Sequence, residues 1–245
     1  MEPEAFGVVV SGGASGLGAA VAAHFVAAGA HVVVLDLRPG EHGELVEGDV
    51  TDPAAVGAAV AAAAAAPAGL RLAVSCAGIG PPERVLGREG PHDLERFTHV
   101  VTVNLIGTFN LLRLAAEQMA TNAEGADGER GVIVNTASIA AFEPQIGQAA
   151  YAASKGGVVS MALAAAQELS QRGIRVVTIA PGIFDTPLLA TLSEDVRHAL
   201  GQSQPFPKRL GDPAEFASLV AHIYENRLLN GATLRLDSGL RMPPR

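Results

Sequence analysis

The chain has 245 residues, with 17 Lys or Arg against 25 Asp or Glu, so its formal net charge at pH 7 is −8. Hydrophobic residues make up 49% of it, 28 residues are glycine and one, Cys76, is cysteine. The apolar fraction excludes an intrinsically disordered chain, and the single cysteine excludes a disulfide framework. An acidic chain offers no clustered basic surface for phosphates, so no nucleic-acid partner is expected.

Two long stretches, 5–35 and 53–70, contain no Asp, Glu, Lys or Arg. The first follows an acidic start, where a secretion signal would be basic, and four glycines between positions 12 and 18 interrupt it. The second is mostly alanine, which is too weakly apolar to partition into lipid. We therefore expect a soluble protein of a reducing compartment, without a membrane span.

Short continuous apolar runs alternate with longer helical stretches along the chain. Strands are predicted at 6–10, 31–35, 44–47, 70–75, 131–136, 174–180 and 232–236. Helices are predicted at 16–28, from 53 onward, 93–121, 148–171, 194–200 and 213–225, with a polar loop at 122–130. Unbroken Val, Ile and Leu runs between helices are typical of a parallel sheet covered on both faces. We predict one α/β domain over 1–245, a doubly wound Rossmann fold with a mostly parallel seven-stranded sheet and helices on both faces.

A glycine-rich turn, Ser11-Gly-Gly-Ala-Ser-Gly-Leu-Gly18, joins the first predicted strand to the first helix. Glycines let the backbone approach a diphosphate, and a helix N-terminus supplies free N–H groups. Asp36 ends the second strand, where a carboxylate accepts hydrogen bonds from the adenosine ribose and repels a 2′-phosphate. This pattern favours NAD over NADP, although Arg38 nearby could contact a phosphate.

A second group of residues has the composition of a proton-transfer site. Tyr151 and Lys155 are four residues apart and share one face of a predicted helix. A neighbouring cation, here Lys155 together with the positive nicotinamide ring, favours the phenolate and lowers the pKa of a tyrosine from its usual value of about 10. Ser138 follows the fifth strand, at the carboxyl edge where doubly wound sheets bind ligands. Each residue alone has an ordinary explanation, such as a surface pair or a turn cap, so the evidence is their combination with the glycine turn.

These motifs together resemble those of the short-chain dehydrogenase/reductase family, including its G-x-x-x-G-x-G spacing at positions 12, 16 and 18. The resemblance implies NAD as the cofactor, no metal, and a catalytic set of Ser138, Tyr151, Lys155 and Asn104. It also implies that Asn104 leaves its helix open for a water that links Lys155 to solvent. The cofactor-binding residues it implies are Gly12, Ser15, Gly16, Leu17, Gly18, Asp36, Asp49, Val50, Cys76, Gly78, Tyr151, Lys155, Pro181, Gly182, Phe184 and Thr186.

Segments 131–138, 148–151 and 205–215 are similar to those of family members that act on 3-hydroxyacyl-CoA. This implies NAD-dependent interconversion of (3S)-3-hydroxyacyl-CoA and 3-oxoacyl-CoA in fatty-acid or branched-chain acyl-CoA oxidation. Acyl-CoA would contact Ser138, Gln145, Gln148 and Tyr151, and a substrate-binding segment near 183–210. The interpretations left open are a 3-oxoacyl-carrier-protein reductase, a reductase of steroid or other carbonyls and, more remotely, an NAD-binding scaffold protein.

The family resemblance also predicts assembly and location. Family members form homotetramers through the helices after the fourth and fifth strands. The predicted helix at 148–171 is apolar around much of its circumference, which requires burial on more than one side. A core helix of a monomer would meet the same requirement. Mitochondrial members have an additional N-terminal stretch, so a cytoplasmic protein of bacterial type is expected.

Overall fold

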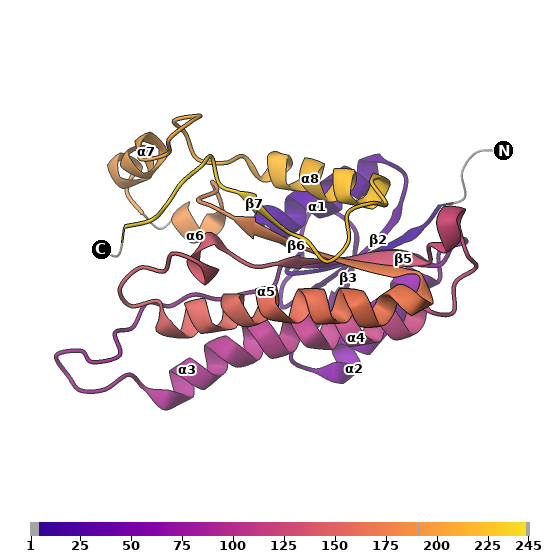
Figure 1. Cartoon of the computed structure of the whole chain (residues 1–245), viewed down its shortest axis with the longest axis horizontal. Helices are drawn as coiled ribbons and strands as arrows, with labels where there is room; N and C mark the ends of the chain where they lie inside the picture. The colour runs from indigo at the N-terminus through magenta and orange to yellow at the C-terminus, as the bar shows by residue number, and fades with distance from the viewer. Residues whose placement is uncertain (1–4, 191, 244–245) are drawn as a thin grey trace.

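A parallel sheet organises the chain, which the computed structural model describes over residues 5–190 and 192–243 (Figure 1). In these ranges it has seven strands: β1 (Gly7–Ser11), β2 (His31–Asp36), β3 (Glu44–Glu47), β4 (Leu70–Ser75), β5 (Gly131–Thr136), β6 (Ile174–Pro181) and β7 (Thr233–Leu236). Their order is β3-β2-β1-β4-β5-β6-β7, and every neighbouring pair is parallel. The predicted doubly wound seven-stranded sheet is therefore confirmed, and it is entirely parallel.

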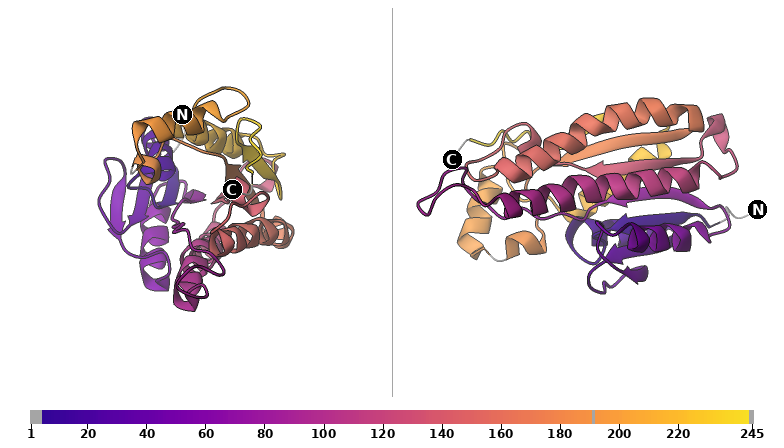
Figure 2. Two further views of the ribbon diagram at one scale, coloured as in Figure 1. Left: turned by 90° about the vertical axis from the view of Figure 1, so that its left-hand side faces the viewer. Right: turned by 90° about the horizontal axis from the view of Figure 1, so that it is seen from below.

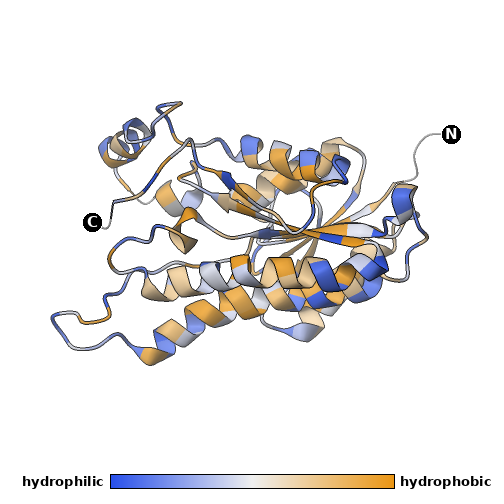
Figure 3. Cartoon of the chain, in the orientation of Figure 1, coloured by the Kyte–Doolittle hydropathy of each residue, from blue (hydrophilic) through white to orange (hydrophobic). Residues whose placement is uncertain are grey.

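Helices cover both faces of this sheet. The helices of the two layers are α1 (Gly16–Ala27) and α8 (Pro213–Glu225) on one face, and α2 (Pro53–Ala64), α4 (Gly107–Met119) and α5 (Ala149–Leu169) on the other (Figures 1 and 2). Successive residues of β1 alternate between the layers: Val8 and Val10 pack with α1 and α8, and Val9 packs with α2 and α4. Apolar residues accordingly concentrate along the sheet and on the inner helix faces (Figure 3).

The strand order places a crevice between β1 and β4. From β1 the chain proceeds outward to β2 and β3, and it then returns to pair β4 with the other side of β1. The connections after β1 and β4 therefore leave their carboxyl ends in opposite directions. Doubly wound sheets bind their ligands at such a switch point.

The helix predicted at 93–121 contains a change of pitch. The structure has α3 (Leu94–Val101), a π-helical turn (Thr102–Ile106) and then α4. The wider turn includes Asn104, and such turns are frequent at functional sites. Among the described residues this continuous stretch is the only helix long and apolar enough, by length and composition alone, to cross a membrane. Half of its apolar window is buried in the domain, as in a core helix.

Two short elements were not predicted from the sequence. A 3₁₀ turn (Ile139–Ala141) directly follows Ser138, and a short helix α6 (Pro187–Ala190) precedes α7 (Glu194–Gln202). Elements of three or four residues have no measurable period of apolar residues, so the pattern could not reveal them. Both elements border the predicted ligand cavity, as described next.

Candidate active site

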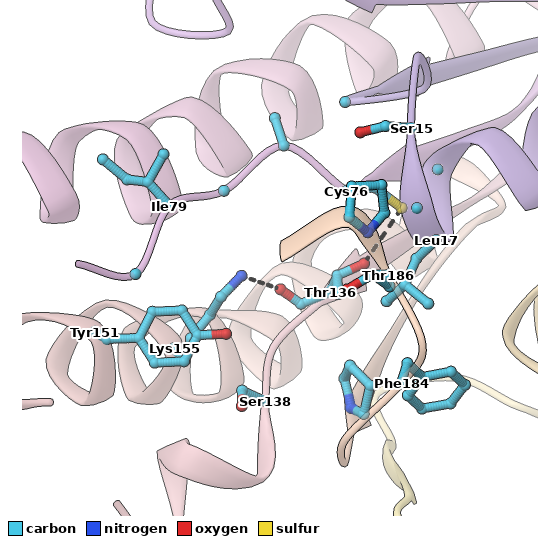
Figure 4. A pocket seen from close by; sticks show the side chains of 18 of the residues that line it. Ser15, Leu17, Cys76, Ile79, Thr136, Ser138, Tyr151, Lys155, Phe184 and Thr186 are labelled. Atoms are coloured by element: carbon cyan, nitrogen blue, oxygen red, sulfur yellow. Dashed lines mark hydrogen bonds between the residues drawn. The ribbon is translucent and has the colours of Figure 1, made fainter. Parts of the chain in front are cut away.

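A cavity of about 810 Å³ opens at the carboxyl ends of the central strands. Ser138, Tyr151 and Lys155 lie on one side of it, and Ser15, Leu17 and Cys76 lie on the other (Figure 4). The predicted residues on its wall are Gly12, Ser15, Gly16, Leu17, Gly18, Asp36, Asp49, Val50, Cys76, Gly78, Ser138, Gln145, Gln148, Tyr151, Lys155, Pro181, Gly182, Phe184 and Thr186. Of the predicted site residues, Asn104 alone is not part of the wall.

The turn after β1 leaves no room for side chains at two of its glycines. Gly12 has φ +68°, and a Cβ built there would lie 2.6 Å from the backbone nitrogen of Ala77. A Cβ on Gly18 would overlap the carbonyl oxygen of Gly12. The chain's own backbone thus excludes a side chain at both positions, and the turn packs closely against the N-terminus of α1, as in turns that accept a diphosphate. The residues present fit a dinucleotide.

The carboxylate of Asp36 is held at the rim of the cavity. Its Oδ2 accepts a hydrogen bond from the backbone N–H of Ala14 at 3.0 Å, and its Oδ1 accepts one from that of Arg38 at 3.3 Å. The side chain of Arg38 is exposed and lies outside the cavity wall. The Asp49 carboxylate accepts two 2.8 Å hydrogen bonds from Thr51, one from the backbone and one from the hydroxyl.

Lys155 is a buried cation with few protein partners. Its side chain is on α5, 4% of the residue is exposed, and Nζ donates to the backbone oxygen of Thr136 at 2.8 Å (Figure 4). Burial lowers the pKa of Lys155 to about 8, because the charged form is removed from water. Its Nζ lies 5.8 Å from the centre of the Tyr151 ring.

Burial decides the pKa of Tyr151 in the protein alone. It raises this pKa, and a hydrogen bond from Ser138 offsets part of that rise. The sequence predicts a lowered pKa from Lys155 together with the positive nicotinamide ring, and for the complex with NAD this stays a prediction. The ammonium is directed at the Thr136 carbonyl, and desolvation penalises the phenolate more than the distant charge favours it.

Ser138 has a structural contact as well as its place on the cavity wall. Its Oγ accepts a hydrogen bond from the backbone N–H of Ala140 at 3.1 Å, so it caps the 3₁₀ turn. The hydroxyl proton is not used in that contact and is free to be donated toward the cavity. The cap fixes the orientation of the side chain, which is what a group that must hold a substrate oxygen requires.

Asn104 lies behind the cavity wall and is completely buried. Its Nδ2 donates to the backbone oxygen of Ile79 at 2.8 Å and to Ser154 Oγ at 3.0 Å, while its Oδ1 accepts from the Ile79 N–H at 2.8 Å. The side chain thus fixes the loop after β4, on which Ile79 lines the cavity. Asn104 lies in the π-helical turn, and the predicted opening of the helix for a water stays a prediction.

Sequence reasoning missed two kinds of cavity residue. Thr136 participates through its backbone oxygen, which any residue type would supply, so no sequence signal exists for it. The apolar end of the cavity is lined by Ile183, Leu189, Leu192, Val196 and Leu200, all within the predicted substrate-binding segment at 183–210, and by Met242, which was not predicted. Met242 comes from the C-terminal tail, and only the path of that tail places it there.

Cys76 and Gln148 have more specific environments than the sequence indicated. Cys76 is half-buried with its Sγ 3.6 Å from Thr136 Oγ1, and burial raises the pKa of its thiol to about 11, which excludes a thiolate nucleophile at neutral pH. Gln148 Oε1 accepts a hydrogen bond from the backbone N–H of Gln145 at 2.9 Å.

In the described ranges no cluster of His, Cys, Asp and Glu could hold a metal ion.

A model of the short chain dehydrogenase family matches residues 7–197. The chain belongs to the short-chain dehydrogenase family. Among relatives of this short-chain dehydrogenase, 3-hydroxyacyl-CoA dehydrogenase type-2 of Bos taurus is 50% identical, covering 96% of this chain and 95% of the relative. The protein of that name from Drosophila melanogaster is 48% identical over 96% and 97% of the two chains. The crystal structure of 3-hydroxyacyl-CoA dehydrogenase type-2 from Mycobacterium avium matches with a TM-score of 0.92 and 42% identity, over 98% of this chain and 97% of that one.

Proposed function

We propose that this short-chain dehydrogenase interconverts a 3-hydroxyacyl-CoA and the corresponding 3-oxoacyl-CoA, with NAD as the hydride acceptor. The observation that carries this proposal is that one cavity combines three kinds of group. Its wall includes the glycine turn, the residues Ser138, Tyr151 and Lys155, and an apolar set from 183–200 together with Met242. Such a cavity has surfaces for a dinucleotide, a reacting carbonyl and an acyl chain. Relatives at about 50% identity named for this reaction support the substrate class.

The chain's own residues would divide the proton chemistry among them. NAD, when bound, supplies the carbon that accepts the hydride from C3 of the substrate. Tyr151, as the phenolate that Lys155 and the positive nicotinamide ring would together favour, takes the proton of the 3-hydroxyl and returns it in the reverse direction. Ser138 donates its free hydroxyl proton to the reacting oxygen, and Lys155 holds the cofactor's ribose with the donors that Thr136 does not use. Proton transfer by a positioned group contributes about 10²–10⁴ in rate.

Asp36 supports NAD rather than NADP. Two backbone N–H groups hold its carboxylate at the rim of the cavity, where it would accept hydrogen bonds from a ribose and repel a 2′-phosphate. Arg38, the side chain that could have compensated for a phosphate, is directed outside the cavity wall. The alternative interpretation, an NADPH-dependent carrier-protein reductase, requires a cation beside the 2′-phosphate, at the position that Asp36 occupies.

One panel tests both the cofactor and the substrate. Initial rates of carbonyl reduction are measured with NADH and NADPH on acetoacetyl-CoA, longer 3-oxoacyl-CoAs, a 2-methyl-branched acyl-CoA, a carrier-protein thioester and a steroid ketone. We expect NADH and the CoA thioesters to give the highest kcat/KM. A preference for NADPH with the carrier-protein thioester, or activity on the steroid alone, would contradict the proposal. Purified protein that turns over none of them would favour a scaffold.

We also propose a homotetramer. Apolar side chains on the π-helical turn, α4 and α5 are exposed in the single chain, namely Ile106, Phe109 and Leu163. Exposed large apolar side chains on these helices are consistent with burial against another subunit. Light scattering should give a particle of four times 24.9 kDa, and a monomer at micromolar concentration would contradict this assembly.

A further inference from the structure

Four charged side chains meet beside the apolar end of the cavity. Arg235, on β7, places Nη1 and Nη2 at 3.1 and 2.8 Å from the two carboxylate oxygens of Glu143. Its Nε lies 2.7 Å from Asp237 Oδ2, and Nη1 of Arg241 lies 3.2 Å from the same oxygen. We refer to Glu143, Arg235, Asp237 and Arg241 as the carboxyl-edge ion cluster.

Arg235 connects two segments that are far apart in sequence. Besides its ion pairs, its Nη2 donates to the backbone oxygen of Leu240 at 3.1 Å, and its guanidinium carbon lies 5.2 Å from the centre of the Phe142 ring. Each of its three nitrogens is therefore occupied by a contact. A planar guanidinium can make this set of contacts at once, and an ammonium cannot.

The first of these segments carries Ser138. The backbone N–H of Glu143 donates to the carbonyl of Ile139 at 2.9 Å, inside the 3₁₀ turn that Ser138 caps. Gln145, on the cavity wall, follows two residues later. The hydrogen bonds from Arg235 lower the pKa of Glu143, so the carboxylate stays ionised at neutral pH. A movement of Glu143 would therefore be transmitted to the turn that holds Ser138.

The second segment is the C-terminal tail. The side chain of Asp237 is 8% exposed, and its Oδ1 accepts from the backbone N–H of Gly239 at 3.0 Å. The backbone N–H of Leu240 donates to the carbonyl of Asp237 at 2.8 Å. These contacts turn the tail back toward the sheet, so that Met242 reaches the apolar end of the cavity.

We propose that Arg235 is a positioning residue that fixes Met242 relative to Ser138 and thereby determines which acyl chains the enzyme accepts. The inference rests on the proposed function, because it assigns the apolar end of the cavity to the acyl chain. The reacting carbonyl is held near Ser138, and the chain extends toward the wall that the tail completes. The carboxyl-edge ion cluster sets the distance between Ser138 and the wall that the tail completes. A long acyl chain contacts that wall more than a four-carbon chain does.

The test compares Arg235→Met with Arg235→Lys and with a matched control, Arg227→Met. Arg227 also forms an ion pair, with its Nε 3.0 Å from Glu129 Oε2, but it lies beyond the end of α8, away from the cavity. For each variant, kcat and KM are measured with acetoacetyl-CoA and with a ten-carbon 3-oxoacyl-CoA. NADH binding and the melting temperature are measured in parallel. Hydrogen exchange is followed in peptides covering 138–148 and 237–243.

For Arg235→Met we expect kcat/KM on the long substrate to fall about 10- to 100-fold and that on acetoacetyl-CoA several-fold less. NADH binding should stay within about twofold of the wild type, since the glycine turn is not contacted. Exchange should accelerate in both segments together. Arg235→Lys should recover only part of the loss, and Arg227→Met should leave the ratio of the two substrates unchanged.

Two results would overturn the proposal. One is that Arg235→Met keeps the wild-type ratio of kcat/KM for the two substrates and also shows wild-type hydrogen exchange in the tail. The other is that its melting temperature falls while neither this ratio nor the exchange changes. If Arg235→Met does not fold, Glu143→Gln removes the same ion pair at nearly equal volume and is judged by the same criteria. Hydrogen exchange needs no substrate, so it tests the cluster even if wild-type protein does not reduce 3-oxoacyl-CoA, which would refute the proposed function instead.

Discussion

Two buried cations, at opposite edges of the same sheet, have opposite environments. Arg175, near the amino end of β6, donates to the backbone oxygens of Ile223, Asn226, Leu229 and Tyr224, and its Nε lies 2.7 Å from Glu129 Oε1. Lys155, at the carboxyl edge, has one hydrogen bond from its three donors within the described chain, to the Thr136 carbonyl. The arginine completes the C-terminal end of α8, whereas the lysine retains donors for a ligand.

The difference shows how burial should be interpreted in this fold. A buried cation that many acceptors surround is costly to remove, because those acceptors are then left buried without it. A buried cation with free donors costs stability, and the lowered pKa of Lys155, about 8, reflects that cost. Buried cations that line a cavity, keep free donors and have a shifted pKa are typical of functional sites. The comparison thus predicts that substitutions at the carboxyl edge lower activity without lowering stability, whereas Arg175→Met at the amino edge lowers stability without lowering activity.

The largest effect is expected for Tyr151→Phe at the carboxyl edge. The substitution removes only the phenolic oxygen, so kcat should fall by about 10²–10⁴ because the proton has no acceptor. Steady-state kinetics with NADH and acetoacetyl-CoA measure this. The melting temperature and NADH binding serve as controls and should change little. A variant within a few-fold of wild-type activity would contradict the assignment of Tyr151.

Arg175→Met tests the amino edge. It removes one of the two arginines that pair with Glu129, whose Oε2 still has Arg227 Nε at 3.0 Å, and it leaves four backbone oxygens without this donor. The free energy of unfolding should therefore decrease by about 3 kcal/mol, the lower end of the range for breaking a buried ion pair. Urea unfolding measures this change. The kcat of the folded variant, measured at low temperature, should equal that of the wild type, since Arg175 is at the edge opposite to the cavity. A loss of kcat without loss of stability would remove the distinction between the two edges.

Lys155→Met is expected to change stability less than Arg175→Met does, and in the opposite direction. The folded-state pKa of Lys155, about 8, is below its ordinary value, so burying the charge costs stability at every pH below about 8. This cost decreases as the pH rises from about 8 toward about 10.4, where the unfolded lysine also loses its proton.

Without cofactor, Lys155→Met should therefore be more stable than the wild type at pH 7, by on the order of 1–3 kcal/mol, and nearly equal to it above about pH 10.5. Urea unfolding at a series of pH values measures this difference. Turnover should be lost at all pH values, which the NADH assay shows. A variant less stable than the wild type at pH 7 would mean that the contact with Thr136 outweighs desolvation.

Features encoded within a few neighbouring residues were predictable. The glycine turn and Asp36 follow from backbone sterics and from the place of each residue at a strand end, and both lie where they were predicted, on the cavity wall. Tyr151 and Lys155 share a side of α5 because of the helical period. The direction of the Tyr151 pKa shift was not predictable, because it depends on how much water the rest of the chain excludes.

Contacts between distant segments were beyond the reach of sequence patterns. Asn104 was expected in the catalytic set, but its partners Ile79 and Ser154 are 25 and 50 residues away, and its role in holding the Ile79 loop appears only in three dimensions. Arg235 and Glu143 are separated by 92 residues, and nothing in either local sequence pairs them.

Local periodicity and turn chemistry were therefore enough to predict the fold class and to place the glycine turn, Tyr151 and Lys155 of this short-chain dehydrogenase on one cavity. Those signals act over one strand or one helical turn, where backbone geometry dictates which residue types are allowed. The shape of the apolar end of the cavity, the environment of Tyr151 and the course of the tail were settled by packing. They depend on burial and on ion pairs between segments that only the folded sheet brings together.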